Sequence, residues 1–113
     1  MKKQIRDGRV AVLVSPGFGA GFSTWASFTS GRAKEFMVFG DENLVRFVEE
    51  ELFDEAEEYV TGWFDGAEED LPYLGGLRDL KVYWVPEGTK FVIEEYDGSE
   101  NLMTLDDFDW SEA

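Results

Sequence analysis

The chain has 113 residues, of which 43% are hydrophobic and 16% aromatic, so we expect one folded domain spanning residues 1–113. It contains no cysteine and no histidine, which excludes disulfides, thiolate chemistry, the usual zinc sites and catalysis based on histidine. A net charge of −15 argues against nonspecific binding to nucleic acid or membrane. We expect a cytoplasmic protein without a cofactor, and the composition favours a binding protein over an enzyme while leaving enzymatic activity open.

The first predicted element is a buried central strand at residues 10–14, a short apolar run flanked by turn-forming residues. Residues 15–33 lack a helical period and predict a long loop, with one turn of helix at 23–27. A second strand is predicted at 35–39, where an apolar run ends at a glycine. The amino-terminal third is therefore expected to supply strands joined by a loop.

Two helical segments are predicted next. Asp41 is suited to cap a helix, and apolar residues then recur at helical spacing as far as Leu52. Asp54 is suited to cap a second helix that reaches Trp63. No glycine or proline separates the two segments, so one continuous helix is an open alternative, and the acidic residues between and after them are expected on its outer surface.

The carboxyl-terminal third predicts consecutive antiparallel strands at residues 80–85, 90–96 and 100–105. Asp97-Gly98 is a strong hairpin signal between the last two strands. The expected fold class is α+β, with a mostly antiparallel sheet of about five strands and one or two helices on one face.

A glycine-rich turn follows the first strand, with Gly17, Gly19 and Gly21 at alternating positions. Such a backbone allows several N–H groups to converge on an anion. Its spacing fits neither the dinucleotide-binding fingerprint, which needs a glycine where Phe22 stands, nor the P-loop. A purely structural turn packed against aromatic side chains is an equally weighted alternative.

The charges are distributed unevenly along the chain. Residues 1–34 contain six basic residues and one acidic residue, whereas the remainder contains four basic and 24 acidic residues. The glycine-rich turn therefore lies in the basic part of an acidic protein. That part either faces an anion or only complements the acidic remainder across the fold.

The first functional hypothesis is a protein that binds and sequesters a small anionic, nucleotide-like ligand. The glycine backbone would meet phosphate, and Arg32 or Lys34 would add positive charge. Trp25 would contact the base beside the hydroxyls of Ser23 and Thr24, and the second hairpin would bind the ribose if it lies next to the turn. The predicted ligand-binding residues are Ser15, Gly17, Gly19, Gly21, Phe22, Trp25, Arg32, Tyr96, Asp97 and Glu100.

Two alternatives remain open. The acidic helices could imitate nucleic-acid phosphates and inhibit a host protein, with Glu50, Glu57 and Glu58 among the residues involved. A carboxylate-dependent hydrolase is the third hypothesis. The expected partner is thus a small anionic ligand or a host protein, with no direct contact to nucleic acid or membrane, and self-association is left open.

Three stretches resemble a family of small accessory proteins common in bacteriophage genomes. They are residues 7–22, with the signature DGxVAVLxSPGxGAG, residues 84–89, WVPEGT, and residues 95–100, EYDGSE. In that family a Trp or Tyr commonly follows the last loop glycine, where this chain has Phe22. The resemblance implies a phage accessory protein that acts in the host cytoplasm against host defence, either by sequestering a nucleotide-derived signal or by blocking a host protein.

Overall fold

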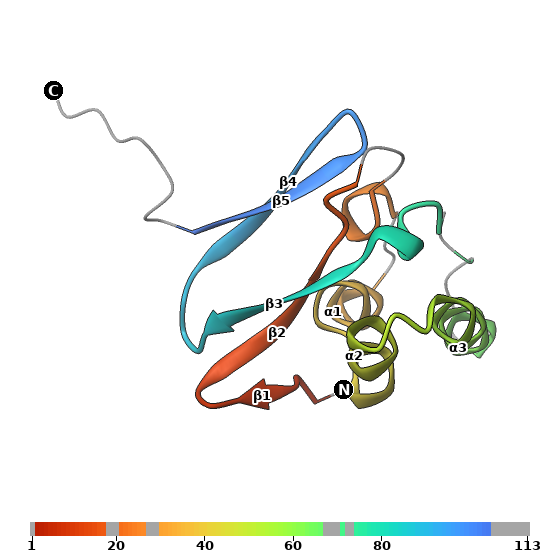
Figure 1. Cartoon of the computed structure of the whole chain (residues 1–113), viewed down its shortest axis with the longest axis horizontal. Helices are drawn as coiled ribbons and strands as arrows, with labels where there is room; N and C mark the ends of the chain where they lie inside the picture. The colour runs from red at the N-terminus through yellow and green to blue at the C-terminus, as the bar shows by residue number, and fades with distance from the viewer. Residues whose placement is uncertain (1, 18–20, 27–29, 67–70, 72–73, 105–113) are drawn as a thin grey trace, which may run out of the picture.

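The computed structural model describes residues 2–17, 21–26, 30–66, 71 and 74–104. Within these residues, five strands form two antiparallel sheets, accompanied by three α-helices and two short 3-10 helices (Figure 1). The expected α+β class with antiparallel pairing is confirmed. The elements run in the order β1 (Ile5–Arg6), β2 (Arg9–Val14), η1 (Ser23–Trp25), α1 (Gly31–Phe39), α2 (Glu42–Glu49), α3 (Phe53–Asp65), η2 (Leu77–Asp79), β3 (Lys81–Pro86), β4 (Phe91–Tyr96) and β5 (Ser99–Thr104).

Strand β2 is the central strand of the first sheet, whose order is β1-β2-β3. Its side chains are buried on both faces. Ala11 and Leu13 belong to the core under the helices, whereas Val12 and Val14 belong to a second core on the opposite face. Burial on both faces explains why the strand is a continuous apolar run rather than an alternating one. The predicted buried central strand is therefore confirmed.

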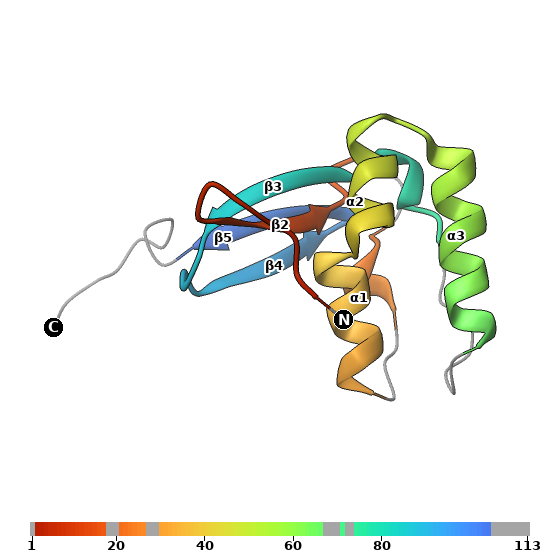
Figure 2. The same ribbon diagram turned by 90° about the horizontal axis from the view of Figure 1, so that it is seen from below.

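The second sheet is the β4–β5 hairpin, which packs on the face of the first sheet opposite to the helices (Figures 1 and 2). Consecutive pairing of the last three strands was predicted, and this is wrong for β3, which pairs with β2 and not with β4. The reason lies in the apolar faces. Phe91, Ile93 and Leu102 pack against Val12 and Val85 of the first sheet, and burial of this apolar surface favours a hairpin stacked on the sheet.

The strand predicted at residues 35–39 is wrong, because these residues form the second half of helix α1. Ser30 caps the first turn of this helix with its side chain, and Gly40 ends it at φ 67°. The helix is buried on two sides: Phe36 lies in the main core, whereas Phe39 packs against the β4–β5 hairpin. Two-sided burial removes the polar residues that normally reveal a helical period, so a short apolar run resembles a strand.

The predicted start of helix α2 is confirmed, because the Asp41 side chain accepts a hydrogen bond of 2.9 Å from the Leu44 N–H. The predicted cap of the next helix is wrong. Helix α3 begins at Phe53, its N-cap is Leu52, and Asp54 lies within the first turn. A carboxylate in the first turn still interacts favourably with the positive end of the helix dipole, which accounts for the acidic residue at that position.

Helices α2 and α3 are two separate helices, not one continuous helix. Glu51 adopts φ 57°, in the left-handed region, and the Leu52 N–H donates to the Phe47 carbonyl at 2.8 Å. This arrangement satisfies carbonyls at the helix end as a left-handed C-terminal residue usually does. Glycine normally occupies such a position. Because this chain has a glutamate there, the sequence gives no signal that helix α2 ends before helix α3.

Two of the three Asp-Gly dipeptides form tight hairpin turns, and the third ends helix α3. Asp7 and Gly8 have φ values of 53° and 76°, and Asp97 and Gly98 have φ values of 51° and 86°. Positive φ at both central residues is typical of the two-residue turns that match the twist of hairpin strands. The predicted hairpin at Asp97-Gly98 is confirmed, whereas the short strand β1 that the first turn creates was missed.

Candidate functional site

The carboxylate of Glu100 lies inside the glycine-rich turn and is fully buried. Its Oε1 accepts a hydrogen bond from the Ser15 N–H at 2.9 Å. Its Oε2 accepts from the N–H groups of Phe22 and Thr24, at 2.7 and 3.0 Å, and from the Thr24 hydroxyl at 2.6 Å. Backbone N–H groups before and after the glycines, those of Ser15, Phe22 and Thr24, thus converge on a carboxylate of the same chain.

The hairpin and the glycine-rich turn are direct neighbours. The Glu100 N–H donates to the Ser15 carbonyl at 2.8 Å, and the Ser99 hydroxyl donates to the Pro16 carbonyl at 2.7 Å. Alternation along β5 places Glu100 on the same face as Leu102, which packs into the second core. The turn is thus attached to the hairpin through backbone and side-chain hydrogen bonds.

A second carboxylate lies opposite Glu100, since Glu95 is its cross-strand partner. Like charges at such a position repel each other unless donors compensate them. The Trp25 indole Nε1 donates to Glu95 at 2.8 Å, and the Gly98 N–H donates to the same carboxylate at 2.8 Å. Element η1 therefore supplies donors to both carboxylates, through Thr24 and Trp25, and this fixes its position against β4 and β5.

The contact between Trp25 and Glu95 is expected to weaken in acid. The hydrogen bonds from Trp25 and then Gly98 lower the pKa of Glu95 from its ordinary value of 4.5. Because the shift is downward, its contribution to stability is present above that value and is lost as pH falls through the pKa of the folded protein. We expect the Trp25 indole N–H resonance to titrate with a midpoint below 4.5, and a midpoint above it would contradict the assignment.

Several predicted ligand residues are inside the protein. Ser15, Phe22 and Glu100 are buried, and Phe22 belongs to the main core. Gly21 is closely packed, since a Cβ atom there would lie 2.5 Å from the Thr24 Oγ1 atom. These four residues build and hold the turn, so none of them presents a side chain to a ligand in this structure.

The other predicted ligand residues are dispersed. Trp25 is 43% exposed beside the turn, and Tyr96 is 80% exposed on the hairpin next to the exposed turn residue Asp97. Arg32 lies on the helical side, with its guanidinium 5.1 Å from the centroid of the Trp63 ring. Gly19 lies outside the described residues. The structure therefore brings together the turn and the hairpin but not Arg32.

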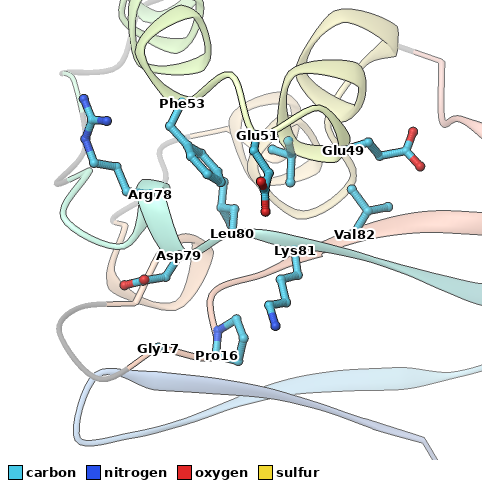
Figure 3. Close-up of a pocket in the computed structure, with 11 residues that line it drawn as sticks. Pro16, Gly17, Glu49, Glu51, Phe53, Arg78, Asp79, Leu80, Lys81 and Val82 are labelled. Carbon is cyan, nitrogen blue, oxygen red and sulfur yellow. The ribbon is translucent and has the colours of Figure 1, made fainter.

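Gly17 lines an open groove of about 760 Å³ on the outer side of the turn (Figure 3). Lys81 points toward Pro16 in this groove, whereas the Arg78 side chain points away and binds Asp54 at 2.6 Å. The acidic side chains that line the groove are Glu49, Glu51 and Asp79. Three carboxylates against two basic side chains give this groove no net attraction for an anion.

A second cavity, which we call the α1–β4 cleft, has a volume of about 470 Å³. Most of its lining is apolar, and the rings of Phe39 and Phe91 meet edge to face with centroids 6.0 Å apart. Element η1, helix α1 and strand β4 supply the lining. The residues are Ser23, Thr24, Lys34, Glu35, Val38, Phe39, Phe91, Val92 and Ile93. The hydroxyl-bearing residues of η1 and the basic Lys34 were all named in the sequence-based hypothesis.

Two ammonium groups adjoin this apolar lining. Lys34 lines the cleft, and the Lys3 Nζ atom lies 4.4 Å from the centroid of the Phe39 ring, which also lines it. Glu35 adds one carboxylate at the same rim. The aromatic lining was missed from the sequence because Phe39 was assigned to a strand and Phe91 lies more than fifty residues further along the chain.

Comparisons with known proteins identify no relative. A scan against protein-family models, a search of curated proteins and a search of solved structures each found no match to this chain. The resemblance to small bacteriophage proteins therefore stays a prediction. Among the described residues, no helix combines the length and apolar character that crossing a bilayer requires, and no group of three or more acidic side chains is arranged to hold a metal ion.

Proposed function

We propose that this protein binds a small anion with a planar apolar part, such as a nucleotide, in the α1–β4 cleft. The observation that carries the proposal is the combination of an aromatic lining with an ammonium group at its rim. A volume of about 470 Å³ lies within the usual range of small-molecule sites, roughly 300–1,000 Å³. Binding without catalysis is proposed, in keeping with the absence of histidine and cysteine.

Each part of such a ligand has a counterpart in the cleft. A flat ring would pack against Phe39 and Phe91, whose edge-to-face arrangement leaves apolar surface toward the cavity. A phosphate would pair with the exposed ammonium of Lys34 and, across Phe39, with that of Lys3. The Glu35 carboxylate would accept hydrogen bonds from ribose hydroxyls or an exocyclic amine.

The glycine-rich turn has an indirect part in this proposal. Its N–H groups hold Glu100, and Glu100 in turn fixes Thr24, a residue of the cleft wall. The phosphate-binding role first expected for the turn is therefore assigned to the rim of the cleft.

Isothermal titration calorimetry against nucleoside monophosphates, cyclic nucleotides and cyclic dinucleotides tests the proposal. At least one member of the panel is expected to bind, and Lys34→Gln is expected to lower its affinity about tenfold because an ionic contact to phosphate is lost. Lys34 is exposed on a helix and glutamine is a good helix former, so the fold should be retained.

Lys90→Gln is the matched control, because Lys90 is an exposed lysine outside the cleft. It removes the same charge and is expected to change affinity by less than about twofold. Binding by no member of the panel would overturn the proposal, and so would an equal loss of affinity in the two lysine variants.

A further inference from the structure

A third depression, which we call the α2–α3 groove, lies between the two helices that run beside each other in Figures 1 and 2. Its volume is about 570 Å³, and it shares no lining residue with the α1–β4 cleft. The residues that line it are Phe47, Glu55, Glu58, Tyr59, Gly62 and Trp63. Half of the lining is aromatic, and the two charged residues are both acidic.

Helix α3 builds most of the groove from a single face. Positions 55, 58, 59, 62 and 63 recur at intervals of three and four residues, so they lie along one side of the helix. Phe47 of helix α2 meets Tyr59 with ring centroids 5.8 Å apart. Gly62 leaves the centre open, since a Cβ atom at this position would have no heavy atom within 4 Å.

The adjacent face of the same helix shows what paired carboxylates of this spacing can hold. Asp54 and Glu57, three residues apart, both bind the guanidinium of Arg78, at 2.6 and 3.3 Å. Glu55 and Glu58 have the same spacing, one residue further along the helix. Within the described part of the chain, neither of these two carboxylates forms an ion pair.

The aromatic rings of the groove also contact guanidinium groups. Arg32 lies over Trp63 at 5.1 Å from the ring centroid, and Arg46 lies over Phe47 at 4.9 Å. Guanidinium groups combine stacking on aromatic faces with bidentate hydrogen bonds to carboxylates, which ammonium groups do less well. Arg32 and Arg46 therefore show that rings of this groove accept guanidinium groups, and the combination of Tyr59 with two carboxylates suits an arginine side chain better than a lysine.

We propose that the α2–α3 groove binds an arginine side chain of a basic partner protein. The guanidinium lies between Glu55 and Glu58 and against the ring of Tyr59, and its aliphatic stem lies over Gly62. The net charge of −15 favours association with a basic surface and increases its rate. This site is separate from the proposed ligand cleft, so a failure of either proposal leaves the other unaffected.

Calorimetry with a hexa-arginine peptide tests this proposal, with hexa-lysine and hexa-citrulline peptides for comparison. The arginine peptide is expected to bind several-fold more tightly than the lysine peptide, and the uncharged citrulline peptide is expected not to bind. The double variant Glu55→Gln/Glu58→Gln should lower affinity at least about fivefold more than Glu87→Gln/Glu94→Gln, which removes the same charge from exposed positions outside the groove.

A second pair of variants leaves the charge unchanged, and only one of the two fills the groove. Gly62→Leu is expected to lower affinity for hexa-arginine about tenfold while raising the melting temperature, because leucine favours helix more than glycine does. Thr61→Leu, exposed on the same helix outside the groove, should change affinity by less than about twofold. Equal effects of the two charge-removing doubles, or an unchanged affinity in Gly62→Leu, would overturn the proposal.

Discussion

Replacing Glu100 by alanine is expected to lower the free energy of unfolding by about 3–5 kcal/mol. The substitution leaves the N–H groups of Ser15, Phe22 and Thr24, and the Thr24 hydroxyl, without their acceptor. Such a loss is a large part of the roughly 5–15 kcal/mol that stabilises a domain of this kind. Denaturant titration followed by circular dichroism measures it directly.

Glu100→Gln distinguishes the charge from the shape of this side chain. Its amide oxygen can replace one carboxylate oxygen, but its NH₂ group then faces N–H donors, so we expect a loss of about 1–3 kcal/mol. Glu94→Gln makes the same chemical change at an exposed position of the neighbouring strand and should cost less than about 0.5 kcal/mol. Similar losses for Glu100→Gln and Glu94→Gln would show that the carboxylate does not hold the turn.

Phe36→Ala is the other substitution with a large expected effect, about 3–5 kcal/mol of lost stability. Phe36 is fully buried in the main core, and its ring stacks on Trp63 with centroids 4.2 Å apart. Removing the ring leaves a cavity between helices α1 and α3, and the same denaturant titration quantifies its cost.

Two further variants provide reference values for the stability lost in Phe36→Ala. Phe36→Leu retains much of the volume and should cost less than about 1.5 kcal/mol. Tyr96→Ala removes a ring of similar size that is 80% exposed, and it should change stability by less than about 0.5 kcal/mol. If Phe36→Ala costs no more than Tyr96→Ala, helix α1 does not pack as the structure shows.

The parts of the fold that the sequence predicted correctly depend on local signals. The apolar run at 10–14, the Asp97-Gly98 turn and the Asp41 cap each act within a few residues, and each is confirmed. Helix α1 and the pairing of β3 depend instead on which surfaces meet in the folded protein. The apolar residues 36–39 lack a helical period because they pack against two separate cores, and this packing leaves no local sequence pattern.

The candidate site was predictable to a lesser extent. The glycine backbone of the turn was expected to bind the phosphate of a ligand, which stays a prediction, and Glu100 was assigned to the ligand, whereas its carboxylate accepts hydrogen bonds from Ser15 and Phe22. Its alternation with Leu102, an inward-facing apolar residue, was the available signal that its side chain points inward. The α1–β4 cleft could not be predicted, because its lining joins three elements whose proximity is set by long-range packing.

The proposed binding of a ligand in the α1–β4 cleft is tested most directly by mapping backbone amide resonances during titration with whichever nucleotide of the panel binds most tightly. We predict that shifts concentrate on Val38, Phe39 and Ile93, which line the cleft, while the amides of Ser15 and Phe22 stay unchanged because they remain bonded to Glu100. Shifts centred on Ser15 and Phe22, with the cleft residues unaffected, would contradict binding in the α1–β4 cleft and would indicate binding at the glycine-rich turn.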